Sequence, residues 1–127
     1  MTFARIDSGR NGEEQAVSYL RRKGYRIIER NYRAKTGEID IIARHGECTC
    51  FVEVRAKNAA VFGTGEESIL KKKQMRISRT ALTYIKKHRL ENKNCRFDVV
   101  SIEGVDSRDP EVKVIENAFD LDARYSY

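Results

Sequence analysis

Two stretches of the sequence decide the fold: Gly37-Glu38-Ile39-Asp40-Ile41-Ile42-Ala43 and Phe51-Val52-Glu53-Val54-Arg55-Ala56-Lys57. Polar and apolar residues alternate in both, which predicts two neighbouring β-strands, each with one buried face. Because successive side chains of a strand point to opposite faces, the polar residues of each strand share one face and the apolar residues share the other. The polar set is Glu38, Asp40, Glu53, Arg55 and Lys57, and the apolar set is Ile39, Ile41, Val52 and Val54.

The acidic residues of the two strands, Asp40 and Glu53 above all, are therefore expected to converge. Two like unit charges about 4 Å apart repel by roughly 4 kcal/mol at an effective dielectric constant of 20. A shared proton or a metal ion normally relieves this repulsion. The pattern thus predicts a divalent-metal site. The alternative is an exposed strand face solvated by water, since acidic and apolar residues often alternate in half-buried strands.

Length and composition limit the class of protein. The 127 residues fit one compact domain, 1–127, with residues 1–8 and 119–127 expected as flexible tails. The sequence contains neither an apolar run of about 20 residues, which would span a bilayer, nor the apolar region of a secretory signal. Its three cysteines, an odd number, argue against a disulfide framework. We expect a cytoplasmic protein with reduced thiols and no membrane partner.

The positive charge is concentrated in one segment. The net charge is +6, and no acidic residue occurs between Ser68 and Leu90. The basic residues of that segment are Lys71, Lys72, Lys73, Arg76, Arg79, Lys86, Lys87 and Arg89. A nucleic acid is the natural partner of such a surface. The alternative is a solvated helix face, the usual fate of a run of charges.

Periodicity and turn residues predict the order of elements along the chain. Helices are expected over 11–23 and 68–88, strands over 25–32, 37–43, 49–55, 96–102 and 112–118, and a loop over 58–67. The order α-β-β-β-α-β-β predicts an α/β fold, a mixed β-sheet flanked by helices.

Several motifs, spread in order from residue 9 to residue 117, resemble the bacterial YraN family. They are Gly9-Arg10-Asn11-Gly12-Glu13-Glu14-Gln15-Ala16, Asn31-Tyr32-Arg33, Gly37-Glu38-Ile39-Asp40, Phe51-Val52-Glu53-Val54, Lys73-Gln74 and Arg96-Phe97-Asp98-Val99-Val100. That family is similar to the archaeal Holliday-junction resolvases and belongs to the PD-(D/E)xK class. The resemblance implies a restriction-endonuclease-like sheet and a nuclease activity.

The resemblance also implies a set of metal ligands. Asp40 and Glu53 would bind Mg²⁺ or Mn²⁺, with the backbone carbonyl of Val54 as a further oxygen ligand. Glu13, on the first helix, would contact the metal directly or through water. Hard divalent cations prefer such oxygen ligands and keep waters, one of which becomes the nucleophile.

Other matching residues would serve the nucleic acid. Gln74 would support the metal site, and Lys73 or Arg76 would hold a phosphate. The set expected to bind the nucleic-acid backbone is Lys71, Lys72, Lys73, Arg76 and Arg79.

The sequence departs from the class pattern at Arg55, where the class has Lys. An Arg side chain stays charged and is a poor proton acceptor, although it binds a phosphate well through two hydrogen bonds. Lys57 lies on the same face about 6.5 Å further along the strand and is the alternative. The departure affects catalysis more than it affects binding of metal or nucleic acid.

The leading hypothesis is a Mg²⁺- or Mn²⁺-dependent endonuclease, a hydrolase that cleaves branched or structured DNA, as a homodimer if two symmetric cuts are made. The first alternative is a catalytically inactive nucleic-acid-binding module in DNA repair or recombination. The second is a protein-interaction domain. The sequence does not separate DNA from RNA.

Overall fold

The computed structural model describes the backbone of residues 2–57 and 71–120, and side chains from residue 12 onward within these ranges. The elements are α1 (Thr2–Arg22), β1 (Arg26–Ala34), β2 (Gly37–His45), β3 (Cys48–Lys57), α2 (Lys71–Lys87), β4 (Cys95–Glu103) and β5 (Glu111–Phe119). The predicted α/β class and the predicted order α-β-β-β-α-β-β are confirmed. No helix in the described part of the chain combines the length and the apolar character needed to cross a bilayer.

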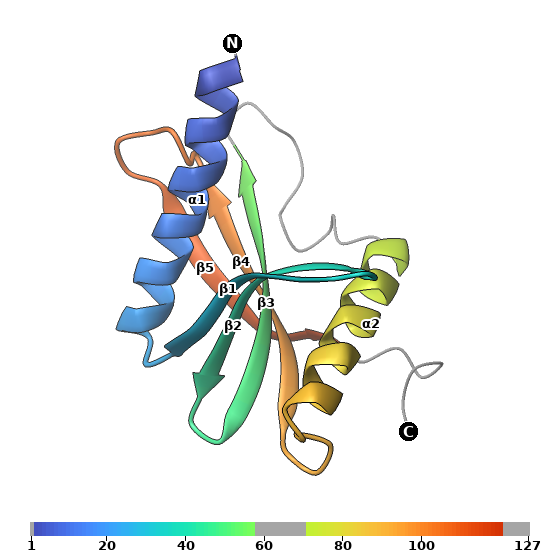
Figure 1. Ribbon diagram of the computed structural model, residues 1–127. Helices are drawn as coiled ribbons and strands as arrows, with labels where there is room; N and C mark the ends of the chain where they lie inside the picture. The colour runs from blue at the N-terminus through green and yellow to red at the C-terminus, as the bar shows by residue number, and fades with distance from the viewer. Residues whose placement is uncertain (1, 58–70, 121–127) are drawn as a thin grey trace.

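The strands form one sheet in the order β1-β2-β3-β4-β5. β3 and β4 are parallel, and the other neighbouring pairs are antiparallel. α2 lies in the connection between the parallel strands, as a parallel crossover requires. Figure 1 shows α1 on one side of the sheet and α2 on the other. The mixed sheet flanked by helices is therefore as predicted.

The boundaries differ from the prediction mainly at the N-terminus. α1 begins at Thr2, whereas the predicted helix begins at residue 11, so residues 2–8 of the expected tail are helical. β5 ends at Phe119, and the remainder of the second expected tail, from residue 121, lies outside the described residues. The predicted loop over 58–67 and the first residues of the second predicted helix also lie outside them.

Each helix packs on its own hydrophobic core. Ala16, Val17 and Leu20 of α1 pack against a cluster that includes Ile41 and Val52. On the other face, α2 packs on a second cluster of aliphatic and aromatic side chains; its buried members are Tyr32, Ile39, Ile42, Phe51, Ile77, Ala81, Tyr84, Ile85 and Phe97. The sheet is thus buried on both faces.

The prediction that Ile39 and Ile41 share a face is wrong. Ile41 packs on the α1 side, whereas Ile39 belongs to the α2 side. The change of face occurs opposite Asn31, which has a φ of 54° and lies between Arg30, the partner of Ile41, and Tyr32, the partner of Ile39. β1 also shifts register between Ile27 and Glu29, and a bulge of this kind bends a strand and increases its twist.

The bent hairpin reaches α2. The rings of Tyr32 and Tyr84 meet edge to face with centroids 5.2 Å apart, and the hydroxyls of Thr36 and Thr80 are 2.9 Å apart. Figure 1 shows the tip of the hairpin beside the upper half of α2. This contact brings the start of β2, which carries Asp40, next to the start of α2.

A buried polar cluster joins β4 to the connection between α1 and β1. Asp98 is fully buried, and its carboxylate accepts hydrogen bonds from the Tyr25 hydroxyl at 2.8 Å, the Arg96 guanidinium at 2.9 Å and the Asn117 backbone N–H at 2.9 Å. His45 stacks on Tyr25 and contacts Arg96 through Nδ1 at 2.9 Å. Asp98 is thus the structural hydrogen-bond acceptor of this region.

Candidate metal centre and nucleic-acid interface

The site begins where the sheet splits between β2 and β3. The paired residues of these strands end at Ile41 and Val52, whereas β3 stays paired with β4 as far as Lys57. In the split, the Asp40 carboxylate accepts the backbone N–H of Val54 at 2.8 Å. The Asp40 side chain thus accepts the hydrogen bond that a backbone carbonyl of β2 would accept if the two strands stayed paired. This contact fixes Asp40 beside the edge of β3.

Glu53 brings the second carboxylate to the same place. It is 8% exposed, and its side chain hydrogen-bonds that of Asp40. Burial, and then the hydrogen bond and negative charge of Glu53, raise the pKa of Asp40 to about 8. The two acidic residues therefore converge as the alternating pattern predicts. The solvated strand face is excluded for Glu53, because that side chain is buried.

A lysine of α2 compensates the charge of this pair. Lys73 Nζ lies 2.7 Å from Glu53 Oε2, and its side chain is 39% exposed while that of Glu53 is 9% exposed. The family resemblance implies a phosphate as the partner of Lys73, and the sequence does not predict the ion pair with Glu53. The sequence does carry a sign that these lysines have a partner. Three lysines in the first turn of a helix interact unfavourably with the helix dipole, so something other than helix stability keeps them there.

A cavity of about 230 Å³ opens at the acidic pair. It is lined by Gly37, Glu38, Asp40, Glu53, Lys73, Arg76 and Ile77. Glu38, on its rim, forms an ion pair with Arg33 at 2.8 Å. The cavity thus holds carboxylates on the strand side and cationic groups on the α2 side.

Glu13 does not line this cavity. It projects from α1, on the other face of the sheet, and its Oε1 accepts hydrogen bonds from Arg30 at 3.1 Å and Asn31 at 3.0 Å. In the part of the chain that the structure describes, no three His, Cys, Asp or Glu side chains gather in a metal-binding group. Of the three carboxylates that line the cavity, Glu38 is paired with Arg33 at its rim, so Asp40 and Glu53 are the candidate metal ligands. Metal contact by Glu13 stays a prediction.

The backbone of β3 offers a further oxygen. The N–H and the C=O of a strand residue point to the same edge of the strand. Because the N–H of Val54 is directed to Asp40, the Val54 carbonyl faces the split as well. This orientation is the one that the predicted third ligand requires.

Three predicted site residues lie near the cavity without lining it. Arg55 and Lys57 follow Glu53 on the same side of β3, and both are half-buried. Gln74 follows Lys73 on α2 and is also half-buried. None of the three lines the cavity, and their catalytic roles stay predictions.

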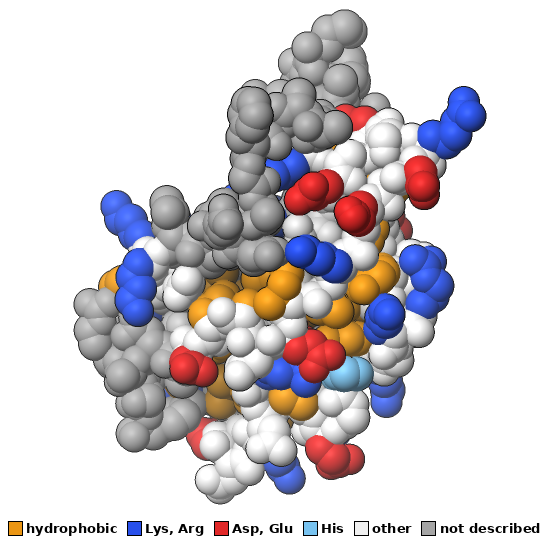
Figure 2. All heavy atoms as spheres, turned by 180° about the vertical axis from the view of Figure 1, so that it is seen from behind, with side chains coloured by type: hydrophobic (Ala, Val, Ile, Leu, Met, Phe, Trp, Pro, Cys, Tyr) orange, Lys and Arg blue, Asp and Glu red, His pale blue; other side chains and the backbone are white. Residues whose placement is uncertain are grey.

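The predicted nucleic-acid residues lie on α2. Lys71, Lys72, Arg76 and Arg79 are exposed, and Arg76 also lines the cavity. On the face shown in Figure 2, by contrast, basic and acidic side chains are interspersed among the residues drawn in colour. The acid-free helix beside the acidic pair is thus the better candidate for contact with a polyanion.

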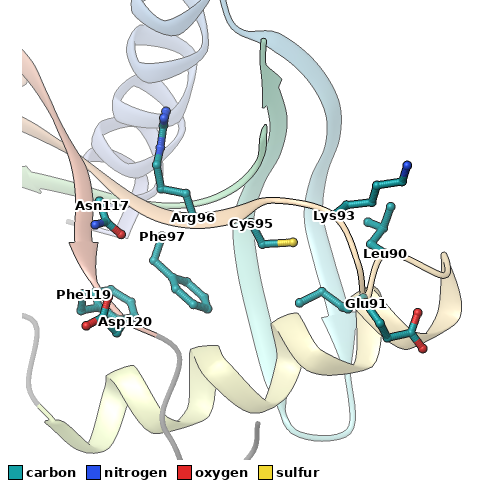
Figure 3. A pocket seen from close by; sticks show the side chains of 10 residues that line it. Leu90, Glu91, Lys93, Cys95, Arg96, Phe97, Asn117, Phe119 and Asp120 are labelled. Carbon is teal, nitrogen blue, oxygen red and sulfur yellow. The ribbon is translucent and has the colours of Figure 1, made fainter. Parts of the chain in front are cut away.

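A second cavity, also of about 230 Å³, lies at the opposite end of α2. Figure 3 shows Phe97 and Phe119 on the α2 side of β4 and β5, whereas Arg96 points away from α2. The two phenyl rings stack with centroids 4.8 Å apart. The lining of this second cavity has no buried carboxylate pair, since Glu91 and Asp120 are exposed. The first cavity is therefore the better metal site.

The sequence comparisons agree with the motifs. The model of the family described as "Uncharacterised protein family UPF0102" matches residues 12–102. The chain belongs to the UPF0102 family. A UPF0102 protein of Hahella chejuensis is 52% identical over 95 residues, which is 75% of this chain and 77% of the relative. A UPF0102 protein of Syntrophus aciditrophicus is 44% identical over 119 residues, 91% of each chain. UPF0102 is the YraN family, so the family predicted from the motifs is confirmed.

The UPF0102 match spans the whole candidate site. Residues 12–102 include Asp40, Glu53 and Lys73, and they also include Glu13 and the described part of α2. β5 lies beyond the match. The part of the chain that forms the cavity is therefore the part by which the UPF0102 family is recognised.

Proposed function

We propose that this protein is a Mg²⁺- or Mn²⁺-dependent nuclease that hydrolyses phosphodiester bonds in branched or structured DNA. The observation that carries the proposal is the Asp40–Glu53 pair, held in a cavity at a split in the sheet and bordered by a basic helix. The family resemblance makes this chemistry an expectation, and the site carries the argument because one fold can host many functions.

The donor set suits a hard divalent cation. Carboxylate and backbone carbonyl oxygens are the ligands that Mg²⁺ and Mn²⁺ prefer. The raised pKa of Asp40 means that the pair resists a second negative charge unless a cation is added. When bound, the metal would polarise the phosphate and lower the pKa of a water molecule.

The residues around the pair would bind and orient the substrate. Arg76 lines the cavity, and a guanidinium group binds a phosphate through two parallel hydrogen bonds. Lys71, Lys72 and Arg79 are exposed on the same helix, and they would contact neighbouring phosphates without reading sequence. Arg55 would stabilise charge on the phosphate.

The substrate class rests on the resemblance to Holliday-junction resolvases. Such enzymes make two symmetric cuts, so we extend the proposal to a homodimer with one site per subunit.

A second function, a nucleic-acid-binding module without catalysis, is favoured by two observations. Arg55 stands where the class has Lys, and Arg is a poor proton acceptor. In addition, Lys73 already neutralises Glu53. Binding of nucleic acid does not separate the two functions, whereas turnover does.

The test is cleavage by the purified protein with Mn²⁺ on linear, single-stranded, flapped and four-way-junction DNA, and on matched RNA. Asp40→Asn and Glu53→Gln remove the proposed ligands with little change of shape, and Glu38→Gln at the rim is the control. Cleavage by the wild type and by the control, lost in both ligand variants, is the expected result. If no substrate is cut while all proteins bind in a salt-dependent way, the non-catalytic module is correct.

A further inference from the structure

The ammonium group of Lys73 contacts the Glu53 carboxylate, and a metal ion bound to that carboxylate would lie close to the ammonium. We propose that Lys73 is a built-in counterion that a divalent metal displaces, and that metal binding thereby releases the Lys73 side chain to a phosphate of the nucleic acid. The inference rests on the proposed metal site, and it assigns to Lys73 the coupling between metal and nucleic acid.

The geometry makes the two cations competitors. Lys73 Nζ is 2.7 Å from Glu53 Oε2, and both residues line the same cavity as Asp40. Mg²⁺ binds carboxylate oxygens at about 2.0–2.1 Å and demands a nearly octahedral set of ligands. A metal held by Glu53 would therefore lie within a few ångströms of Nζ. Two unit charges about 4 Å apart repel by roughly 4 kcal/mol at a dielectric constant of 20, and the metal carries two.

Lys73 is able to leave. Its side chain is 39% exposed, whereas the Glu53 side chain is 9% exposed, so the lysine is the partner that solvent reaches. A lysine has a flexible four-carbon stem and three donors that rotate freely. In a helix, residues three apart are neighbours on one face, which places Lys73 beside Arg76. Released from Glu53, the ammonium would join the Arg76 guanidinium at the rim of the cavity.

Displacement couples the two ligands. If metal binding frees a phosphate-binding group, the metal raises the affinity for nucleic acid, and nucleic acid raises the affinity for metal by the same factor. Without Lys73, the metal no longer competes with an internal cation. A variant that lacks this ammonium is therefore expected to bind metal more tightly and to lose the coupling.

The first measurement is Mn²⁺ affinity in the absence of nucleic acid, by titration calorimetry at constant ionic strength. Lys73→Met is compared with the wild type and with Lys72→Met, which removes the same charge from an exposed neighbour on the same turn. We expect Lys73→Met to bind Mn²⁺ about five- to tenfold more tightly, within the range of typical coupling energies, and Lys72→Met to match the wild type. Lys73→Arg, which keeps the cation, is expected to stay close to the wild type.

The second measurement is the affinity for labelled four-way-junction DNA with and without Ca²⁺, which tests binding apart from cleavage. Ca²⁺ is expected to increase the affinity of the wild type and of Lys72→Met, and to leave that of Lys73→Met unchanged. Equal or weaker Mn²⁺ binding by Lys73→Met overturns the inference, and so does the absence of Mn²⁺ binding in both proteins. A tighter Mn²⁺ complex without any DNA cleavage supports the counterion and refutes the nuclease, so the two failures are distinguishable.

Discussion

At the scale of single residues, Asp40 combines the position of a candidate metal ligand with a cost in stability. Its carboxyl group is held by the N–H of Val54 on one side and by Glu53 on the other. Such a group is suited to a metal, and without one it retains a proton because of burial and its acidic neighbour. Functional sites commonly keep perturbed groups of this kind.

This cost predicts a pH dependence of stability in metal-free protein. The pKa of Asp40 is raised from 3.8 to about 8 in the folded state, so between these pH values the folded protein holds a proton that the unfolded chain has lost. Stability from this residue therefore falls as the pH rises through that window. Asn cannot titrate, and it still offers an oxygen to Val54 and a donor to Glu53.

We expect Asp40→Asn to gain stability over the wild type from pH 4 to pH 8, with a slope of at most about 1.4 kcal/mol per pH unit. Urea unfolding in the presence of a chelator, with Glu38→Gln as the control, measures this. A difference that stays constant with pH would show that Asp40 is ionised in the folded protein. Added Mn²⁺ should stabilise the wild type and not the variant.

Asp98 makes a purely structural prediction. It is fully buried and accepts hydrogen bonds from Tyr25, Arg96 and Asn117, so its removal leaves a half-buried guanidinium and a buried hydroxyl without their acceptor. Asp98→Ala is expected to cost about 3–5 kcal/mol of unfolding free energy. Glu116→Ala is the control, because Glu116 meets the same Arg96 at 3.4 Å while 51% exposed. We expect it to cost less than about 1 kcal/mol. If the two variants lose similar amounts of unfolding free energy, the buried hydrogen bonds of Asp98 contribute no more than a surface ion pair.

At the scale of elements, the sequence predicts regular strands better than bent ones. The alternation in β3 is correct, since Val52 and Val54 pack with the α1 cluster and Glu53 faces Lys73 of α2. The alternation in β2 fails at Ile39, because the positive φ of Asn31 in the partner strand and the reach of the hairpin to α2 turn that end of the strand. A pattern within one strand carries no information about a distortion that its partner imposes.

The contact between α1 and β3 explains a glycine in the first motif. A Cβ at Gly12 would lie 2.9 Å from Cβ of Ala56 and 3.6 Å from Val105. The helix therefore approaches the sheet more closely than any other residue would allow. The sequence identifies the motif, but only the packing of two distant elements shows why Gly is needed.

Gly12→Ala accordingly tests packing against helix propensity. In an isolated helix the change would stabilise by about 1 kcal/mol, whereas overpacking costs about 1–3 kcal/mol. We expect a net loss of about 1 kcal/mol in urea unfolding, with partial recovery in the double variant Gly12→Ala, Ala56→Gly, which removes the opposing methyl group. If Gly12→Ala alone raises stability, the helix shifts outward freely and the contact is not constrained.

At the scale of the whole molecule, the site exists because three separate parts of the chain meet. Asp40 comes from the bent hairpin, Glu53 from the central strand and Lys73 from the crossover helix. The two strand residues were predictable from alternation and from the family motifs. The ion pair of Lys73 with Glu53 was not, because it depends on how α2 crosses the sheet. The position of Glu13 was not predictable either, since α1 lies on the opposite face.

The same arrangement gives the molecule one helix with a single sign of charge beside the acidic pair. If that helix binds the nucleic-acid backbone, each phosphate contact releases counterions, and the logarithm of affinity falls with the logarithm of salt concentration by about 0.9 per contact on duplex DNA. The double variant Lys72→Gln, Arg79→Gln should therefore lower the salt slope by up to about 2 and weaken binding at low salt.

The matched control removes two charges from the other helix. Arg21 and Arg22 are exposed in the last turn of α1, so Arg21→Gln, Arg22→Gln changes the net charge by the same amount at a different place. We expect its salt slope, measured by anisotropy over a series of salt concentrations, to equal that of the wild type. Equal loss in both double variants would mean that binding follows the net charge of the whole protein, and α2 would then be a solvated face.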